Sequence, residues 1–281
     1  MKKSPTLFIV LALTILCINV FGQVKGYPFA VKVSGKGKNA IIFIPGFASS
    51  GDVWTETRSA FEKNNTCYTL TMAGFAGMPA QGSPSFKEWE DAIAAYIIST
   101  KINKPVIVGH SMGGGLALAI AADYPNLPSK IVVVDALPCL AAVRNPAFKS
   151  NPNNDCSAMV ARFTAISDEQ FSQMQNYGMH QLMDDTIHFK QVVQWSLASD
   201  RKTFATMYCD FTNTDLRDKI AAVKCPALIL LESSFATIKP TIADQYKSLT
   251  TAQLSYANKG KHFIMYDDTD WYMQQLSAFI K

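Results

Sequence analysis

A short segment in the first half of the chain combines a buried strand, a serine between glycines and a small-residue helix. Residues 106–108 are apolar and β-branched, and they lead directly into Gly109-His110-Ser111-Met112-Gly113. The apolar run 116–122 that follows is typical of a buried helix. Gly-x-Ser-x-Gly at such a junction predicts a sharp corner, where side chains at the glycines would collide with backbone. The Ser111 hydroxyl is then exposed beside the positive end of a helix.

Glycine-rich turns between a strand and a helix also occur in nucleotide-binding loops. Those loops carry Gly-x-Gly-x-x-Gly or a lysine directly after the glycines. Neither feature follows Ser111 in this chain. The sequence therefore favours a nucleophilic serine at this corner over a phosphate-binding loop.

Apolar strands alternate with helical segments along much of the chain, which predicts an α/β fold with a doubly wound, mostly parallel sheet. Strands are expected at 40–44, 67–72, 106–108, 130–134, 227–231 and 253–257, and helices at 86–99 and 270–280. The alternation stops between residues 136 and 224. Amphipathic helices are expected there instead, with starts near Asp155, Ser167, Asp184 and Asp200. We interpret this segment as a helical lid.

The first residues have the layout of a secretory signal peptide. Lys2 and Lys3 precede an apolar run over residues 7–18, and the small residue Gly22 follows. The run is shorter than the about 20 residues of a membrane span, so an uncleaved anchor is the less favoured alternative. We expect cleavage near Gly22 and an exported protein, periplasmic or secreted, with no stable membrane span after processing.

The predicted organisation is a signal peptide over 1–22, a core in two parts over 23–138 and 225–281, and the lid over 139–224. The formal net charge of +4 includes Lys2 and Lys3, and no basic cluster indicates a nucleic-acid partner. Five cysteines follow the signal peptide: Cys67, Cys139, Cys156, Cys209 and Cys225. Their spacing fits no zinc site, so no metal is predicted. One or two disulfides or buried free thiols are both compatible with this number.

Four motifs of the chain resemble those of the α/β-hydrolase fold superfamily. They are Ile44-Pro45-Gly46-Phe47, Gly109-His110-Ser111-Met112-Gly113-Gly114, the strand ending Val134-Asp135, and Lys259-Gly260-Lys261-His262-Phe263 before a terminal helix. The resemblance covers nearly all of the chain after the signal peptide. It implies a serine hydrolase without a cofactor, whose helical lid is inserted after the sixth strand. It does not indicate the substrate, because this fold supports many chemistries.

A serine nucleophile needs a base and a group that orients the base. The family order is serine, acid, histidine, which assigns the base to His262, after the last strand and before the last helix. His180 and His188 lie in the predicted lid, and we expect the ring of His110 to point away from Ser111.

The acid is chosen between two positions. Most relatives carry an aspartate after the strand that follows the lid, where this chain has Phe235, and Glu232 lies nearer the strand. Some short-lid esterases carry the acid at the end of the strand before the lid, which here is Asp135. Both strand ends lie beside the histidine loop at the same edge of the sheet. We predict Asp135, with Glu232 as the alternative.

The oxyanion hole is predicted from two backbone N–H groups, those of Phe47 and Met112. The predicted lid is rich in methionine and aromatic residues, which indicates an adaptable apolar wall over Ser111. We therefore expect an ester, lactone or thioester as the small-molecule acyl substrate. The alternatives are an amidase or carbon–carbon bond hydrolase with the same triad, and a non-catalytic small-molecule receptor on the same fold.

Overall fold

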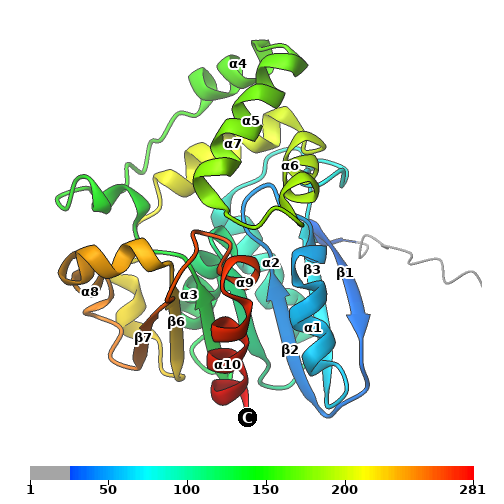
Figure 1. Cartoon of the computed structure of the whole chain (residues 1–281), viewed down its shortest axis with the longest axis vertical. Helices are drawn as coiled ribbons and strands as arrows, with labels where there is room; N and C mark the ends of the chain where they lie inside the picture. The colour runs from blue at the N-terminus through cyan, green and yellow to red at the C-terminus, as the bar shows by residue number, and fades with distance from the viewer. Residues whose placement is uncertain (1–25) are drawn as a thin grey trace, which may run out of the picture.

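The computed structural model describes residues 26–281, which form a seven-stranded sheet with helices on both faces (Figure 1). The strands are β1 (Phe29–Ser34), β2 (Asn39–Ile44), β3 (Asn65–Met72), β4 (Val106–His110), β5 (Lys130–Val134), β6 (Ala227–Leu231) and β7 (Ala252–Tyr256). They lie in the order β1-β3-β2-β4-β5-β6-β7, and β1 is antiparallel to β3 while the other pairs are parallel. The predicted α/β fold with a doubly wound, mostly parallel sheet is confirmed.

Alternate residues of the central strands pack into two separate cores, because successive side chains of a strand point to opposite faces. Ile42 and Ile44 of β2 belong to one core, and Ile41 and Phe43 belong to the other. The first core is covered by α2 (Phe86–Ser99), α3 (Met112–Asp123) and α8 (Lys239–Tyr246), and the second by α1 (Thr55–Phe61) and α10 (Thr269–Ile280). The near-continuous apolar strands thus fill both sides of the sheet.

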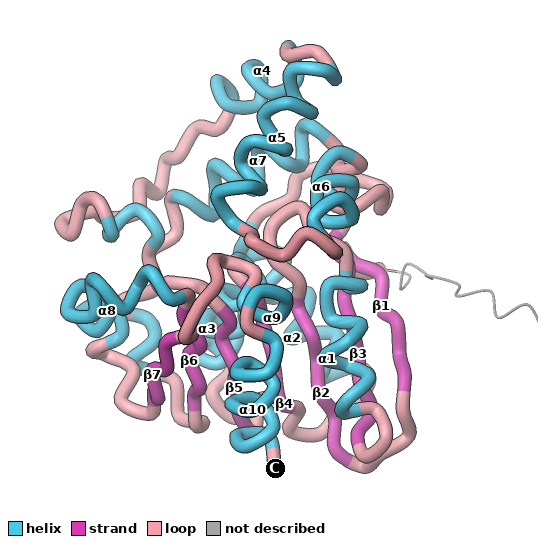
Figure 2. The backbone as a smooth tube through the Cα atoms, viewed as in Figure 1, coloured by secondary structure: helices cyan, strands magenta, loops and turns pink. Residues whose placement is uncertain are grey.

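A helical segment separates β5 from β6 and lies above the carboxyl ends of the strands (Figure 2). It contains four helices, α4 (Ser157–Ala165), α5 (Asp168–Leu182), α6 (Phe189–Leu197) and α7 (Arg201–Thr212), which we call the cover helices. Four short 3-10 helices are η1 (Gly51–Trp54), η2 (Leu140–Val143), η3 (Lys219–Ala222) and η4 (Ser233–Ile238). The resemblance implied a lid after the sixth strand. Residues 26–281 form seven strands, and the segment follows the fifth of them, β5.

The starts of the cover helices agree with the sequence at two positions. Ser167 forms a capping box with Gln170 at the start of α5, and the carboxylate of Asp200 accepts the N–H of Thr203 in α7. Helix α4 begins at Ser157, two residues after Asp155. The predicted start at Asp184 is wrong, since α6 begins at Phe189.

The predicted signal peptide, residues 1–22, lies outside the described residues. Within the described range, no helix has both the length and the apolar character needed to cross a membrane. The described chain begins four residues after the predicted cleavage site at Gly22.

The cysteines divide between one crosslink and buried thiols. A disulfide joins Cys156, next to α4, to Cys209 in α7, so it ties two cover helices together. Cys67, Cys139 and Cys225 are free and buried. Burial raises the pKa of Cys67 and of Cys225 to about 11, which keeps both as neutral thiols. In these three positions cysteine acts as a small apolar residue.

The turn from β4 into α3 is packed so tightly, both against itself and against the end of β2, that it admits no side chain at two positions. A Cβ at Gly109 would lie 2.0 Å from the carbonyl oxygen of Gly113. A Cβ at Gly113 would lie 2.4 Å from the carbonyl oxygen of Ile44 and 2.5 Å from that of Pro45. These neighbours are backbone atoms, which cannot move aside as a flexible side chain can. The close approach therefore fixes the position of the corner relative to β2.

We expect Gly113→Ala to lower the free energy of unfolding by about 2 kcal/mol, since the added methyl group forces two packed backbone segments apart. Gly178→Ala is the matched control, because Gly178 lies within α5 and a Cβ there meets nothing within 4 Å. The control is expected to change stability by no more than about 1 kcal/mol, in the stabilising direction. Urea denaturation of both variants measures the difference, and equal stability of the two would contradict this account of the corner.

Candidate active site

Ser111 occupies the corner between β4 and α3 in a conformation that non-glycine residues rarely adopt. Its φ is 52° and its ψ is −122°, and its N–H donates to the carbonyl oxygen of Val134 at 2.9 Å. Strained backbone of this kind persists where the surrounding packing enforces it, and it is found most often at functional sites. The corner places Ser111 in the wall of a cavity beneath the cover helices.

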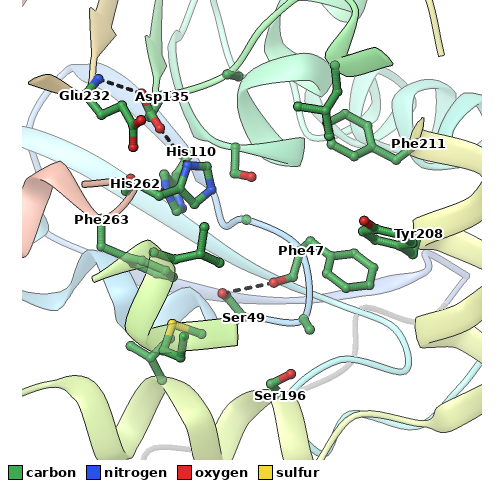
Figure 3. Close-up of a pocket in the computed structure, with 18 of the residues that line it drawn as sticks. Phe47, Ser49, His110, Asp135, Ser196, Tyr208, Phe211, Glu232, His262 and Phe263 are labelled. Carbon is green, nitrogen blue, oxygen red and sulfur yellow. Dashed lines mark hydrogen bonds and ion pairs between the residues drawn. The ribbon is translucent and has the colours of Figure 1, made fainter. Parts of the chain in front are cut away.

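His262 and Asp135 lie 127 positions apart in the sequence and meet at the carboxyl edge of the sheet. His262 lies in the loop between β7 and α9 (Ile264–Asp267), and Asp135 directly follows β5. The Nδ1 of His262 donates to Oδ2 of Asp135 at 2.6 Å (Figure 3). Because the carboxylate only accepts hydrogen bonds, the proton is on Nδ1 and Nε2 carries the lone pair. The imidazole is thus held in the tautomer that a general base requires.

Asp135 is shielded from solvent and uses both of its carboxylate oxygens. Its side chain is 2% exposed, whereas that of His262 is 21% exposed. The second oxygen, Oδ1, accepts the backbone N–H of Glu232 at 2.6 Å. These two contacts leave the carboxylate little freedom to rotate. Because the carboxylate is fixed, it also fixes the orientation of the imidazole ring that donates to it.

Glu232, the alternative acid, contacts Asp135 through its backbone and not through its carboxylate. It follows β6, lines the same cavity, and accepts a hydrogen bond from the Ser234 hydroxyl. Burial, and then the neighbouring charge of Asp135, raise the pKa of Glu232. Phe235, at the usual position of the acid, lies in η4 and also lines the cavity. The structure therefore pairs His262 with Asp135 and leaves Glu232 beside the pair.

His110 lies under the loop between β7 and α9 that carries His262, which we call the histidine loop. The sequence did not indicate this contact between His110 and the loop. His110 is 1% exposed, and the centroid of its ring lies 4.6 Å from that of the His262 ring. Its Nε2 donates to the carbonyl oxygen of His262 at 3.0 Å. Burial, and secondly the nearby His262, hold the pKa of His110 well below its ordinary value, so the ring is neutral. His110 thus supports the backbone at His262 from the strand that carries Ser111.

The side chains of Asp267 and Asp268 accept hydrogen bonds from the backbone of the histidine loop. Asp268 accepts the backbone N–H groups of Asn258 at 3.0 Å and Lys259 at 3.3 Å through one oxygen. Oδ2 of Asp267 accepts the N–H of Lys261 at 2.8 Å. Its other oxygen accepts the N–H groups of Asp184 and Asp185, from the segment between α5 and α6. The loop that carries His262 is therefore tied to the cover helices as well as to the core.

The remaining two histidines lie away from this pair. The His180 ring stacks on Phe189 with centroids 4.2 Å apart. His188 contacts the carboxylates of Asp185 and Glu56 and stacks on another aromatic ring. Neither histidine lines the cavity that contains Ser111. Among residues 26–281 no group of three potential ligand side chains could hold a metal ion.

The two predicted oxyanion donors lie on either side of the corner. Met112 is the first residue of α3, where a helix has no internal partner for its N–H. Phe47 lies in the loop after β2. This loop packs closely on His110, since a Cβ at Gly46 would lie 2.8 Å from Nδ1 of that histidine. Neither the N–H of Phe47 nor that of Met112 donates to another residue within 26–281. Both N–H groups are therefore free to donate to a ligand oxygen.

The cavity has a volume of about 390 Å³ and is walled by the core on one side and by the cover helices on the other. The core contributes the loop after β2, the corner, the residues after β5 and β6, and the histidine loop. The cover helices contribute Gln175, Met179, Leu182, Val192, Ser196, Tyr208 and Phe211. Described lysine and arginine side chains are absent from this lining, which is mostly apolar. Ser111 and His262 share the wall, although no hydrogen bond joins their side chains in the described structure.

Comparison with known proteins identifies related enzymes. Residues 41–275 match the sequence profile of the Alpha/beta hydrolase family. A pimeloyl-[acyl-carrier protein] methyl ester esterase from Vibrio cholerae is 21% identical over 252 residues, covering 88% of this chain and 96% of that protein. An N-formylmaleamate deformylase from Pseudomonas putida is 23% identical over 256 residues, covering 89% of this chain and 91% of that protein. A crystal structure of an enol-lactonase from Burkholderia xenovorans superimposes with a TM-score of 0.75 at 13% sequence identity, covering 92% of this chain and 98% of that chain. The family resemblance seen in the four motifs is confirmed.

Asp135→Asn is expected to reduce kcat for hydrolysis by about 10⁴-fold, because the amide leaves the imidazole in the wrong tautomer, as in serine proteases. Glu232→Gln is the matched control, a carboxylate-to-amide exchange in the same cavity that leaves the contact of His262 intact, and its effect should be much smaller. Steady-state kinetics of both variants test the assignment. A larger loss in Glu232→Gln than in Asp135→Asn would reverse it.

Proposed function

Since the chain belongs to the alpha/beta hydrolase family, we propose that it is a serine hydrolase that cleaves an ester, lactone or thioester through an acyl-enzyme on Ser111. The observation that carries the proposal is the hydrogen bond between His262 and Asp135. It supplies an oriented base at the cavity that contains the strained serine. A His262 without a carboxylate partner would have favoured the non-catalytic receptor instead, and labelling of Ser111 by a fluorophosphonate probe separates the two hypotheses.

In the first half-reaction the Ser111 oxygen attacks the carbonyl carbon of the substrate, and Nε2 of His262 accepts the hydroxyl proton. The N–H groups of Phe47 and Met112 stabilise the negative charge that develops on the carbonyl oxygen. When the intermediate collapses, the bond to the leaving group breaks and His262 passes the proton to that group. Asp135 stays ionised and stabilises the imidazolium that forms in between.

In the second half-reaction a water molecule replaces the leaving group. His262 removes a proton from the water as it attacks the acyl carbon, and the proton returns to the Ser111 oxygen when the acid is released. The missing hydrogen bond between Ser111 and His262 is compatible with this role, because such contacts are often long in unliganded enzymes. Substrate binding would bring the two side chains into reach.

The cavity favours a small or medium apolar acyl group. Its mostly apolar lining and its volume of about 390 Å³ suit such a group. Among residues 26–281 no lysine or arginine lines the cavity, whereas a phosphorylated substrate would need such a cation. The relatives include a methyl ester esterase, a deformylase and an enol-lactonase. Esters and lactones are therefore the first substrates to test, followed by amides.

We expect Ser111→Ala and His262→Ala each to lower hydrolysis by about 10⁴-fold or more without unfolding the protein, because both side chains act at the chemical step. His180→Ala is the control, a histidine outside the cavity. Turnover of an ester and lactone panel provides the measurement, and a fluorophosphonate probe should label the parent protein but not Ser111→Ala. Near-parental turnover in either variant, or undiminished labelling of Ser111→Ala, would refute the proposal.

We also propose that the protein is exported and that its mature form begins near Gln23. The basic residues and short apolar run of the first segment support this, and so does the disulfide between Cys156 and Cys209, since disulfides persist in oxidising compartments. Mass spectrometry of the protein from fractionated cells of the native host should find a mature terminus near Gln23 outside the cytoplasm. An intact Met1 in the cytoplasmic or membrane fraction would contradict export.

A further inference from the structure

The apolar roof of the cavity contains one fixed polar pair, formed by Gln175 of α5 and Ser196 of α6. Both residues line the cavity, and Ser196 is 4% exposed. The Ser196 hydroxyl donates to Oε1 of Gln175 at 2.7 Å. Neighbouring residues on the same two helices, Met179 and Val192, are apolar. In Figure 3, Ser196 lies across the cavity from His262 and Asp135.

The hydrogen bond determines which group Gln175 presents to a ligand. Its carbonyl oxygen is occupied by Ser196, so the amide nitrogen remains with two N–H donors. Within residues 26–281 that nitrogen donates no hydrogen bond, and the one bond of the Gln175 side chain is to its oxygen. A ligand that supplies an acceptor to a donor in apolar surroundings binds more tightly. A ligand that leaves this donor unpaired loses binding free energy. The pair is therefore suited to bind an oxygen atom of the substrate.

The charges of the cavity decide which kind of oxygen fits. Lysine and arginine are absent from its described lining, while two carboxylates, Asp135 and Glu232, are present. A ligand carboxylate would be desolvated without a cation and would face like charges, both of which are unfavourable. A neutral carbonyl oxygen avoids both penalties and still accepts from the amide.

We propose that Gln175, oriented by Ser196, binds a neutral carbonyl oxygen that the acyl group carries at a distance from the bond that is cleaved. The substrate would be an ester, lactone or thioester whose acyl chain crosses the cavity from Ser111 to the roof and ends in a ketone, amide or second ester. This inference rests on the proposed function, and it names the class of acyl group that the same site selects.

The test uses p-nitrophenyl esters that differ in one group. 4-Oxopentanoate, 5-oxohexanoate and 6-oxoheptanoate esters place the ketone at three distances, and each is compared with the unsubstituted ester of equal chain length and with a carboxylate-ended ester. We expect the parent protein to prefer one ketone ester over its unsubstituted partner by about tenfold in kcat/KM, the range of one neutral hydrogen bond. The carboxylate-ended ester should be the poorest of the three.

Gln175→Leu should abolish this preference, so that the ratio of the two kcat/KM values falls to about one, and Ser196→Ala should lower it partially. Gln173→Leu is the matched control on the same helix, because Gln173 is exposed and lies outside this cavity, and the ratio should not change. Rescue by Gln175→Asn is not expected, since the shorter side chain cannot reach the same position.

Two outcomes would overturn the inference while leaving the serine hydrolase intact. The parent protein could hydrolyse the esters without preferring any ketone, or the preference could survive in Gln175→Leu. If no ester were hydrolysed at all, the proposed function would fail instead. In that case calorimetric titration with 2-octanone decides the inference separately, because its binding should weaken in Gln175→Leu and not in Gln173→Leu.

Discussion

The hydrogen bond between Asp135 and His262 is the contact on which the account of the site depends, and it exists because parallel strands end at one edge of a sheet. Strands β4, β5 and β6 are neighbours, and each is followed by a residue of the site: Ser111, Asp135 and Glu232. The histidine loop after β7 reaches back over this edge to place His262 against Asp135. A carboxylate at the end of β5 is therefore closer to the base in space than its position in the sequence suggests.

Ser111 is held by a different constraint, which is that two neighbouring positions in the turn have no side chain. Gly109 and Gly113 let α3 approach β2 and β4 more closely than any other residue would allow. That approach forces the positive φ of Ser111 and exposes its hydroxyl to the cavity. The strain is balanced by the packing of α3, which is almost entirely buried and contributes many residues to one core. Catalytic geometry and core packing thus rest on the same short segment.

Local patterns predicted most of the core, and they failed where a contact depends on tertiary arrangement. The strands from 40 to 257 agree with the sequence to within about two residues, but β1 was missed because Lys32 and the polar end of the strand weaken its apolar pattern. The start of α6 was wrong because Asp185 accepts the N–H of His188 in the turn before the helix. The support of His262 by His110 spans 152 positions, and no local signal indicates it. The choice of Asp135 came from a family pattern, and the structure places its carboxylate on His262. The pairing of Gln175 with Ser196 depends on how α5 and α6 pack, which periodicity does not specify.

If Ser111 is the nucleophile, it is acylated in each turnover, and trapping the acyl-enzyme detects this step. The protein is mixed rapidly with p-nitrophenyl butyrate, quenched in acid within the first turnover, digested and analysed by mass spectrometry. We expect a butyryl group on the peptide that contains Ser111, together with an initial burst of p-nitrophenol. A butyryl group on another residue, or steady turnover without any acylated peptide, would contradict this role of Ser111.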